Sequence, residues 1–146
     1  MNKLVVVVFC LFVCSESKLI EFEDCGNGQM KDIDVSPCDQ EPCLVEGGKP
    51  YSIKGFLVSD VDTDKPFMRL QEQSEGKWYN FQGVDTDPCQ KIMKCPVKAG
   101  EKTPFELTVV AGDAIHDMDT NVRVKFYENA NREKVIGCAS ARIHLK

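Results

Sequence analysis

The 146-residue sequence contains little of what catalysis requires. It has only two histidines, His116 in an acidic stretch and His144 close to the C-terminal end. It contains no Gly-x-Ser-x-Gly, Gly-x-Gly-x-x-Gly or Walker loop, which are typical of serine hydrolases and nucleotide-binding proteins. We therefore expect a protein that is not an enzyme and that holds no cofactor.

Basic residues are in the minority, with 18 Lys and Arg against 23 Asp and Glu, and the formal net charge is -5. An acidic balance argues against nucleic acid, because phosphates attract a positive surface. The sequence also lacks an apolar run long enough for a transmembrane helix, which needs about 20 residues. We expect no nucleic-acid partner and no stable membrane insertion, and transient contact with a membrane or a receptor stays open.

The longest apolar run lies at the start of the chain, from Leu4 to Cys14. One positive charge, Lys3, precedes this run and polar residues follow it, which is the layout of a secretory signal peptide. The small residues Ser15 and Ser17 favour cleavage after Ser17. We therefore expect a signal peptide at residues 1–17 and a single domain at residues 18–146. The protein is expected to be secreted and extracellular, with the lysosomal lumen as the alternative location.

Eight cysteines are present, and Cys10 and Cys14 belong to the predicted signal peptide. The remaining cysteines are even in number, which in an exported chain predicts disulfides rather than free thiols. Close neighbours along the chain can each close a short loop, and the two outermost cysteines are then left to join the ends of the domain. The spacing favours three disulfides: Cys38–Cys43, Cys89–Cys95 and Cys25–Cys138.

Metal binding is the competing role for these cysteines and for the acidic clusters. The cysteine pairs lack the tight spacing of zinc knuckles, and His116 and His144 lie far from them. The acidic turn Asp60–Asp64 alternates like a calcium loop, but Lys65 and Gln71 stand where that loop needs Gly and Glu. Three further aspartates are expected in an exposed loop: Asp113, Asp117 and Asp119. We expect no metal site.

Short runs of alternating apolar and polar residues, separated by turn residues, predict an all-β fold. Evenly spaced strands of this kind are typical of a sandwich or a barrel. The predicted strands are residues 19–24, 29–35, 50–60, 66–71, 77–81, 104–110, 121–127 and 135–145.

Alternation also predicts which side chains face the interior, because successive residues of a strand point to opposite faces. These side chains either fill a solid core or surround a cavity, and alternation alone favours the solid core. Trp78, the only tryptophan, points away from the predicted interior. It is either a packed or exposed ring without a function, or part of an aromatic rim at the mouth of a cavity. The predicted inward set is Tyr51, Ile53, Leu57, Met68, Leu70, Tyr79, Phe81, Phe105, Leu107, Val109, Val122, Val124 and Phe126.

Two series of short motifs follow one another through residues 18–146. The first half contains Asp24-Cys25-Gly26, Val35-Ser36-Pro37-Cys38, Glu41-Pro42-Cys43 and Gly48-Lys49-Pro50-Tyr51. The second half contains Asp87-Pro88-Cys89, Met93-Lys94-Cys95-Pro96-Val97, Lys98-Ala99-Gly100 and Gly137-Cys138-Ala139. In order and spacing this series resembles the ML, or lipid-recognition, domain family. Within the family, it is similar to the soluble sterol-transfer members of Niemann-Pick type C disease and to group 2 mite allergens.

The resemblance implies an immunoglobulin-like β-sandwich of two antiparallel sheets with three disulfides. It also implies a hydrophobic cavity between the sheets, surrounded by the inward set. The function that follows is that of a secreted lipid-binding or lipid-transfer protein, whose partner is a hydrophobic small molecule such as a sterol or a fatty acid. The alternative is an ML-type innate-immune or receptor-docking module that recognises lipid together with a protein partner.

Phe81 lies eight residues before Cys89 and matches the aromatic residue at the pocket entrance of the sterol-transfer members. Those members have a proline-rich stretch at this point, whereas this chain reads Lys-Trp-Tyr-Asn-Phe-Gln over residues 77–82. No Asn-x-Ser/Thr sequon occurs in the sequence. The sequence therefore favours plain secretion over glycan-dependent delivery to the lysosome.

Overall fold

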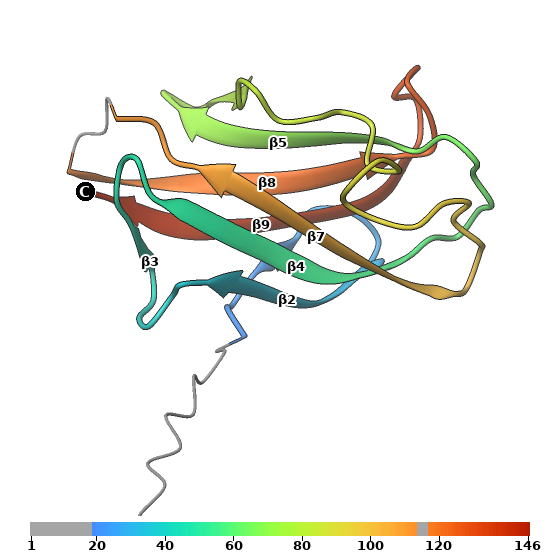
Figure 1. Cartoon of the computed structure of the whole chain (residues 1–146), viewed down its shortest axis with the longest axis horizontal. Coiled ribbons are helices and arrows are strands. Elements are labelled where there is room, and N and C mark those ends of the chain that lie inside the picture. Colours follow the sequence, from blue (N-terminus) through green and yellow to red (C-terminus); the bar gives the residue numbers. More distant parts are fainter. Residues whose placement is uncertain (1–18, 114–116) are drawn as a thin grey trace, which may run out of the picture.

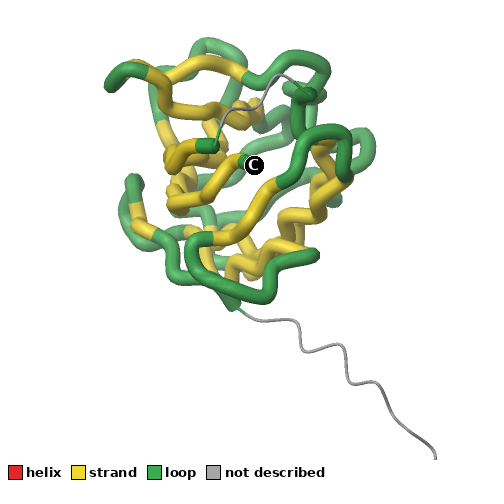
Figure 2. The backbone as a smooth tube through the Cα atoms, turned by 90° about the vertical axis from the view of Figure 1, so that its left-hand side faces the viewer, coloured by secondary structure: helices red, strands yellow, loops and turns green. Residues whose placement is uncertain are grey.

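The computed structural model describes residues 19–113 and 117–146, which form an immunoglobulin-like β-sandwich. The predicted signal peptide at residues 1–17 and His116 lie outside the described residues. Two sheets pack face to face, and the described part of the chain consists of strands and loops alone (Figures 1 and 2). The all-β prediction is confirmed.

The larger sheet has six strands and the smaller sheet has three. The larger sheet runs in the order β1 (Glu23–Asp24), β9 (Val135–Leu145), β8 (Met118–Tyr127), β5 (Phe67–Ser74) and β6 (Lys77–Asn80), and β3 (Cys43–Val45) pairs with β9. The smaller sheet runs in the order β2 (Met30–Ser36), β4 (Pro50–Val58) and β7 (Lys102–Val110).

Alternation along β8 sets the inner face of the larger sheet. Val124 lies between Leu70 of β5 and Ala139 of β9 in the strand register, and all three side chains are buried. Residues directly opposite one another in paired strands share a face, so these three form one apolar row. Arg123 and Lys125 alternate with Val124 and therefore lie on the outer face.

Apolar contacts join the two sheets. Phe105 of β7 meets Phe126 of β8 edge to face, with ring centroids 5.1 Å apart. The sheets approach closely at Gly137 of β9, because a Cβ at this position would lie 2.5 Å from Leu57 Cδ1 and 2.8 Å from Met30 Sδ. A glycine here lets side chains from the smaller sheet reach the backbone of the larger one.

All three predicted disulfides are confirmed: Cys25–Cys138, Cys38–Cys43 and Cys89–Cys95. Cys25–Cys138 joins residues 113 positions apart, and it fastens the start of the domain to β9. The other two close loops of 5 and 6 positions. The long-range bridge therefore constrains the unfolded chain far more than either short one.

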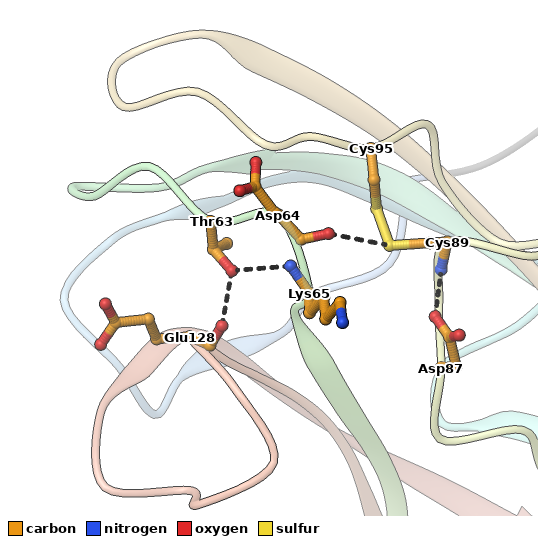
Figure 3. Close-up of a disulfide and its surroundings, with 7 residues drawn as sticks. All are labelled: Thr63, Asp64, Lys65, Asp87, Cys89, Cys95 and Glu128. Carbon is orange, nitrogen blue, oxygen red and sulfur yellow. Dashed lines mark hydrogen bonds between the residues drawn. A yellow bond between two sulfur atoms is a disulfide. The ribbon is translucent and has the colours of Figure 1, made fainter.

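Near Cys89–Cys95, hydrogen bonds join the loop at Thr63 to the loop at Glu128 and fix the turn before Cys89 (Figure 3). The Thr63 hydroxyl donates to the backbone oxygen of Glu128 at 2.6 Å and accepts from the Lys65 N–H at 3.3 Å. The backbone N–H of Cys89 donates to the Asp87 carboxylate at 3.0 Å. This end of the sandwich is held by polar contacts as well as by its disulfide.

The structure corrects two strand predictions. Residues 19–24 do not form one strand, because Leu19 bridges to Asp34 of the smaller sheet whereas Glu23 pairs with Ser140 of the larger sheet. The segment crosses from one sheet to the other and is a strand only at Glu23–Asp24. The three-residue strand β3 was not predicted, since so short a run shows no alternation, and its parallel pairing with β9 is an exception in otherwise antiparallel sheets.

Removing the long-range disulfide should cost much more stability than removing a short one. We expect the Cys25→Ala/Cys138→Ala pair to lose about 5 kcal/mol of unfolding free energy and the control pair Cys38→Ala/Cys43→Ala about 2 kcal/mol, since loop-closure entropy grows with loop length. Urea unfolding of both secreted variants measures the difference. Equal losses would show that loop length does not determine how much each disulfide contributes to the unfolding free energy.

Gly137→Ala should destabilise the domain by about 1–3 kcal/mol through overpacking. Gly112→Ala is the matched control, because among the described residues nothing lies within 4 Å of the Cβ that it would add. Its unfolding free energy should stay within about 0.5 kcal/mol of wild type. Thermal and urea unfolding compare the two variants. If the unfolding free energy of Gly137→Ala equals that of wild type, the sheets can move apart at this point without cost.

Candidate functional site

An apolar cavity of about 30 Å³ lies between the sheets. Its walls come from both sheets and from the chain segment before β1. A cavity of about 10–15 Å³ holds one water molecule, whereas pockets for small molecules commonly measure about 300–1,000 Å³. The interior is therefore nearly filled in this conformation, with a small space at one place.

The structure divides the predicted inward set into four groups. Five members line the cavity: Ile53, Leu70, Phe105, Val122 and Val124. Five others are buried in the packed core without lining the cavity: Tyr51, Leu57, Met68, Leu107 and Phe126. Phe81 and Val109 are partly buried against the core. Tyr79 is 48% exposed.

The exposure of Tyr79 corrects its inward assignment. Tyr79 pairs with Glu72 of β5, so it keeps the inner side of the sheet, but β6 is the end strand of the larger sheet. The smaller sheet has three strands, against six in the larger sheet. Trp78 lies on the outer face as predicted, where the Arg123 guanidinium stacks 4.0 Å above its ring.

Phe81 lies directly after β6, and its backbone N–H donates to the Leu70 oxygen at 3.0 Å. Its side chain packs against the core but does not line the cavity in this conformation. The entrance role that the family resemblance implies for Phe81 therefore stays a prediction.

The sequence did not indicate seven apolar residues of the cavity wall: Ile20, Phe22, Met30, Ile33, Val35, Ala139 and Ala141. The two alanines alternate in register within the predicted last strand and could have been found. Met30 and Ile33 could not, because the β2–β4 register shifts between Lys31 and Asp34, and Asp32 has a positive φ of 50°. A bulge of this kind breaks the alternation from which facing is read.

In the turn after β4, Asp60 and Asp62 each bind a different partner. Asp60 pairs with Lys134 at 3.0 Å, and Asp62 accepts the Ala99 N–H at 2.8 Å. The Ala99 N–H and the Lys98 charge hold the pKa of Asp62 below its usual value. Within residues 19–113 and 117–146 no metal-binding group of histidine, cysteine or carboxylate side chains occurs. The same residues contain no helix long and apolar enough to span a membrane.

His144 lies between two carboxylates near the end of β9. Its Nδ1 is 2.7 Å from Asp119 and its Nε2 is 2.8 Å from Asp117. The Asp119 hydrogen bond, followed by the Asp117 contacts, raises the pKa of His144. The hydrogen bonds from His144 and Arg142 lower the pKa of Asp119. This cluster joins β8 to β9 at the surface, away from the cavity.

Two stacked sheets, three disulfides and an apolar cavity between the sheets define the class as a disulfide-braced immunoglobulin-like sandwich with an internal site. The ML domain profile matches residues 20–145. The chain therefore belongs to the ML domain family, as the sequence motifs predicted.

Known proteins support this assignment. Mite group 2 allergen Pso o 2 of Psoroptes ovis is 31% identical over 108 residues, which is 74% of this chain and 74% of that protein. NPC intracellular cholesterol transporter 2 of Mus musculus is 26% identical over 95 residues, 64% of each chain. The crystal structure of a Niemann-Pick type C2 protein from the Japanese carpenter ant has a TM-score of 0.75 at 21% identity, covering 87% of this chain and 100% of that one.

The titration of His144 tests the surface cluster. Its pKa should lie above the ordinary value of 6.5, and Asp119→Asn should bring it down, because the largest cause is the Asp119 hydrogen bond. The folded-state pKa is the higher one, so the stabilisation is present below pH 6.5 and is lost as the pH rises through the folded value. Histidine NMR shifts measured against pH check this, and an unchanged pKa in Asp119→Asn would contradict it.

Proposed function

We propose that this protein is a secreted lipid-binding or lipid-transfer protein that holds a sterol, a fatty acid or a similar hydrophobic ligand between its sheets. The observation that carries the proposal is the apolar cavity whose wall is shared by both sheets. Membership of the ML family supports it, and so does the name of the mouse relative, a cholesterol transporter. Three disulfides suit an exported protein.

The ligand must enlarge the cavity of about 30 Å³ by parting the sheets. Within the described residues, no strand of one sheet pairs with a strand of the other, so parting them breaks no ladder of backbone hydrogen bonds. The cost is lost apolar contact. Each 100 Å² of apolar ligand surface removed from water returns about 2.5 kcal/mol, which offsets that cost.

The cavity can grow toward Phe81, whose side chain packs against the same apolar core. Leu70 lines the cavity, and Phe81 is hydrogen-bonded to the backbone of Leu70. An expanded cavity that reaches this edge would bring Phe81 into contact with ligand, in the entrance position that the family resemblance implies.

Native mass spectrometry and organic extraction of the secreted protein test the proposal directly. We expect a copurified hydrophobic molecule, or saturable binding of a fluorescent sterol or a fluorescent fatty acid. If extracts contain no lipid and neither probe binds, the lipid-carrier function is wrong.

Phe81→Ala should weaken binding of the fluorescent probe about tenfold, which corresponds to about 1.4 kcal/mol of lost contact. Phe56→Ala is the matched control, because Phe56 is a partly buried aromatic on the outer face of the smaller sheet, beneath the Lys102 ammonium. Probe displacement and thermal unfolding are measured on both variants. A Phe81→Ala protein with full affinity and a lower melting temperature would identify Phe81 as ordinary core.

A further inference from the structure

A row of side chains crosses the inner face of the larger sheet from the cavity to the β6 edge. Ala141 of β9 pairs with Val122 of β8, Val122 pairs with Glu72 of β5, and Glu72 pairs with Tyr79 of β6. Residues directly opposite one another share a face, with their Cβ atoms about 4.5–5.5 Å apart. Ala141 and Val122 line the cavity, whereas Tyr79 is 48% exposed. Glu72 therefore lies between the cavity and the open edge.

Glu72 places a charge at an inward position of an apolar strand. By alternation along β5, Met68 and Leu70 share the inner face with Glu72, and both are buried. Leu70 and Val122 line the cavity, so Glu72 adjoins the cavity wall along its own strand and across to β8 (β5 and β8 in Figure 1). The side chain of Glu72 is partly buried. Charged side chains are seldom buried unless they are paired.

No ion pair within residues 19–113 and 117–146 includes Glu72. Arg123 of β8 lies on the outer face, where its guanidinium stacks 4.0 Å above the ring of Trp78. Lys77 lies two residues before Tyr79 on β6, on the same side of the sheet, and is exposed. The carboxylate of Glu72 is therefore left for a ligand that reaches this edge.

A lipid between the sheets keeps its polar end toward water, because burying a polar group without a hydrogen-bond partner costs free energy. In a cavity that grows toward β6, this polar end lies beside Glu72 and Tyr79. An ionised carboxylate only accepts hydrogen bonds, and its bonds are stronger than those between neutral groups. A hydroxyl group can donate to it, an ester cannot, and the carboxylate of a fatty acid is repelled at short distance.

We propose that Glu72 selects neutral lipids that carry a hydroxyl group, such as sterols and fatty alcohols, against fatty acids. This rests on the proposed lipid-binding function and names its ligand class. The apolar wall binds the hydrocarbon of every such ligand, and Glu72 discriminates between their polar ends. Small-molecule pockets commonly combine an apolar lining with a few polar groups that determine specificity in this way.

Three lipids with one hydrocarbon chain test the selection. Parinaric acid is a fluorescent fatty acid, and the alcohol and the methyl ester made from it differ only in the head group. Fluorescence titration of the secreted protein at neutral pH compares their dissociation constants. We expect the alcohol to bind about tenfold more tightly than the acid, with the ester between them.

Glu72→Gln removes the charge and keeps the size of the side chain. It should reduce the preference for the alcohol over the acid about tenfold, chiefly by tightening binding of the acid. Glu106→Gln is the matched control, because Glu106 lies on the outer face of the smaller sheet, where its carboxylate accepts the Ser52 hydroxyl at 2.8 Å. This control should leave the preference unchanged. Thermal unfolding is measured on both variants, since a purely structural effect would weaken all three lipids together and leave their ratio as in wild type.

Lys77→Gln tests the opposite arrangement, in which the lysine holds the carboxylate of a fatty acid. We expect this variant to bind the acid as tightly as wild type does, and a loss of acid affinity would overturn the proposal.

Equal binding of acid and alcohol by wild type, or an unchanged ratio in Glu72→Gln, would rule out selection by Glu72 while lipid binding itself stands. If wild type binds none of the three lipids and no fluorescent sterol, and extracts contain no lipid, the proposed function fails and the selection fails with it.

Discussion

Apolar contact between two sheets is the interaction on which this structure depends. Within the described residues no strand of one sheet is paired with a strand of the other, so backbone hydrogen bonding makes the sheets but does not join them. Side chains such as Phe105 and Phe126 supply the attraction. The same apolar side chains hold the domain together and surround the cavity. Their burial therefore contributes both to folding and to ligand binding.

Residue size decides where that surface leaves room. At Gly137 the side chains of Leu57 and Met30 come so close that a methyl group would clash, and the sheets are packed without space. Further along β9, Ala139 and Ala141 face the smaller sheet and the cavity lies against them. Short side chains opposite β2 therefore place the space at the side of the sandwich that the residues before β1 close.

The Cys25–Cys138 disulfide has two consequences because of where it is attached. It links residues 113 positions apart, so it limits the unfolded chain strongly. It also fixes the end of the segment that crosses between the sheets. One covalent link therefore constrains the unfolded chain and ties the crossing segment to β9.

Most of the strands, the three disulfides and the family could be predicted from the sequence. Alternation places Val122, Val124 and Phe126 on one face whatever the sheet order, because the period of a strand is local geometry. Cysteine spacing favours two short loops for the same local reason.

Features that depend on partners distant in the chain could not be predicted in this way. The crossing of residues 19–24, the parallel pairing of β3 and the exposure of Tyr79 follow from which strands lie next to one another and how far the smaller sheet extends. The bulge at Asp32 turns Met30 and Ile33 toward the same cavity against the alternation of the sequence. The volume of the cavity depends on how closely two sheets approach, and no local pattern encodes that distance.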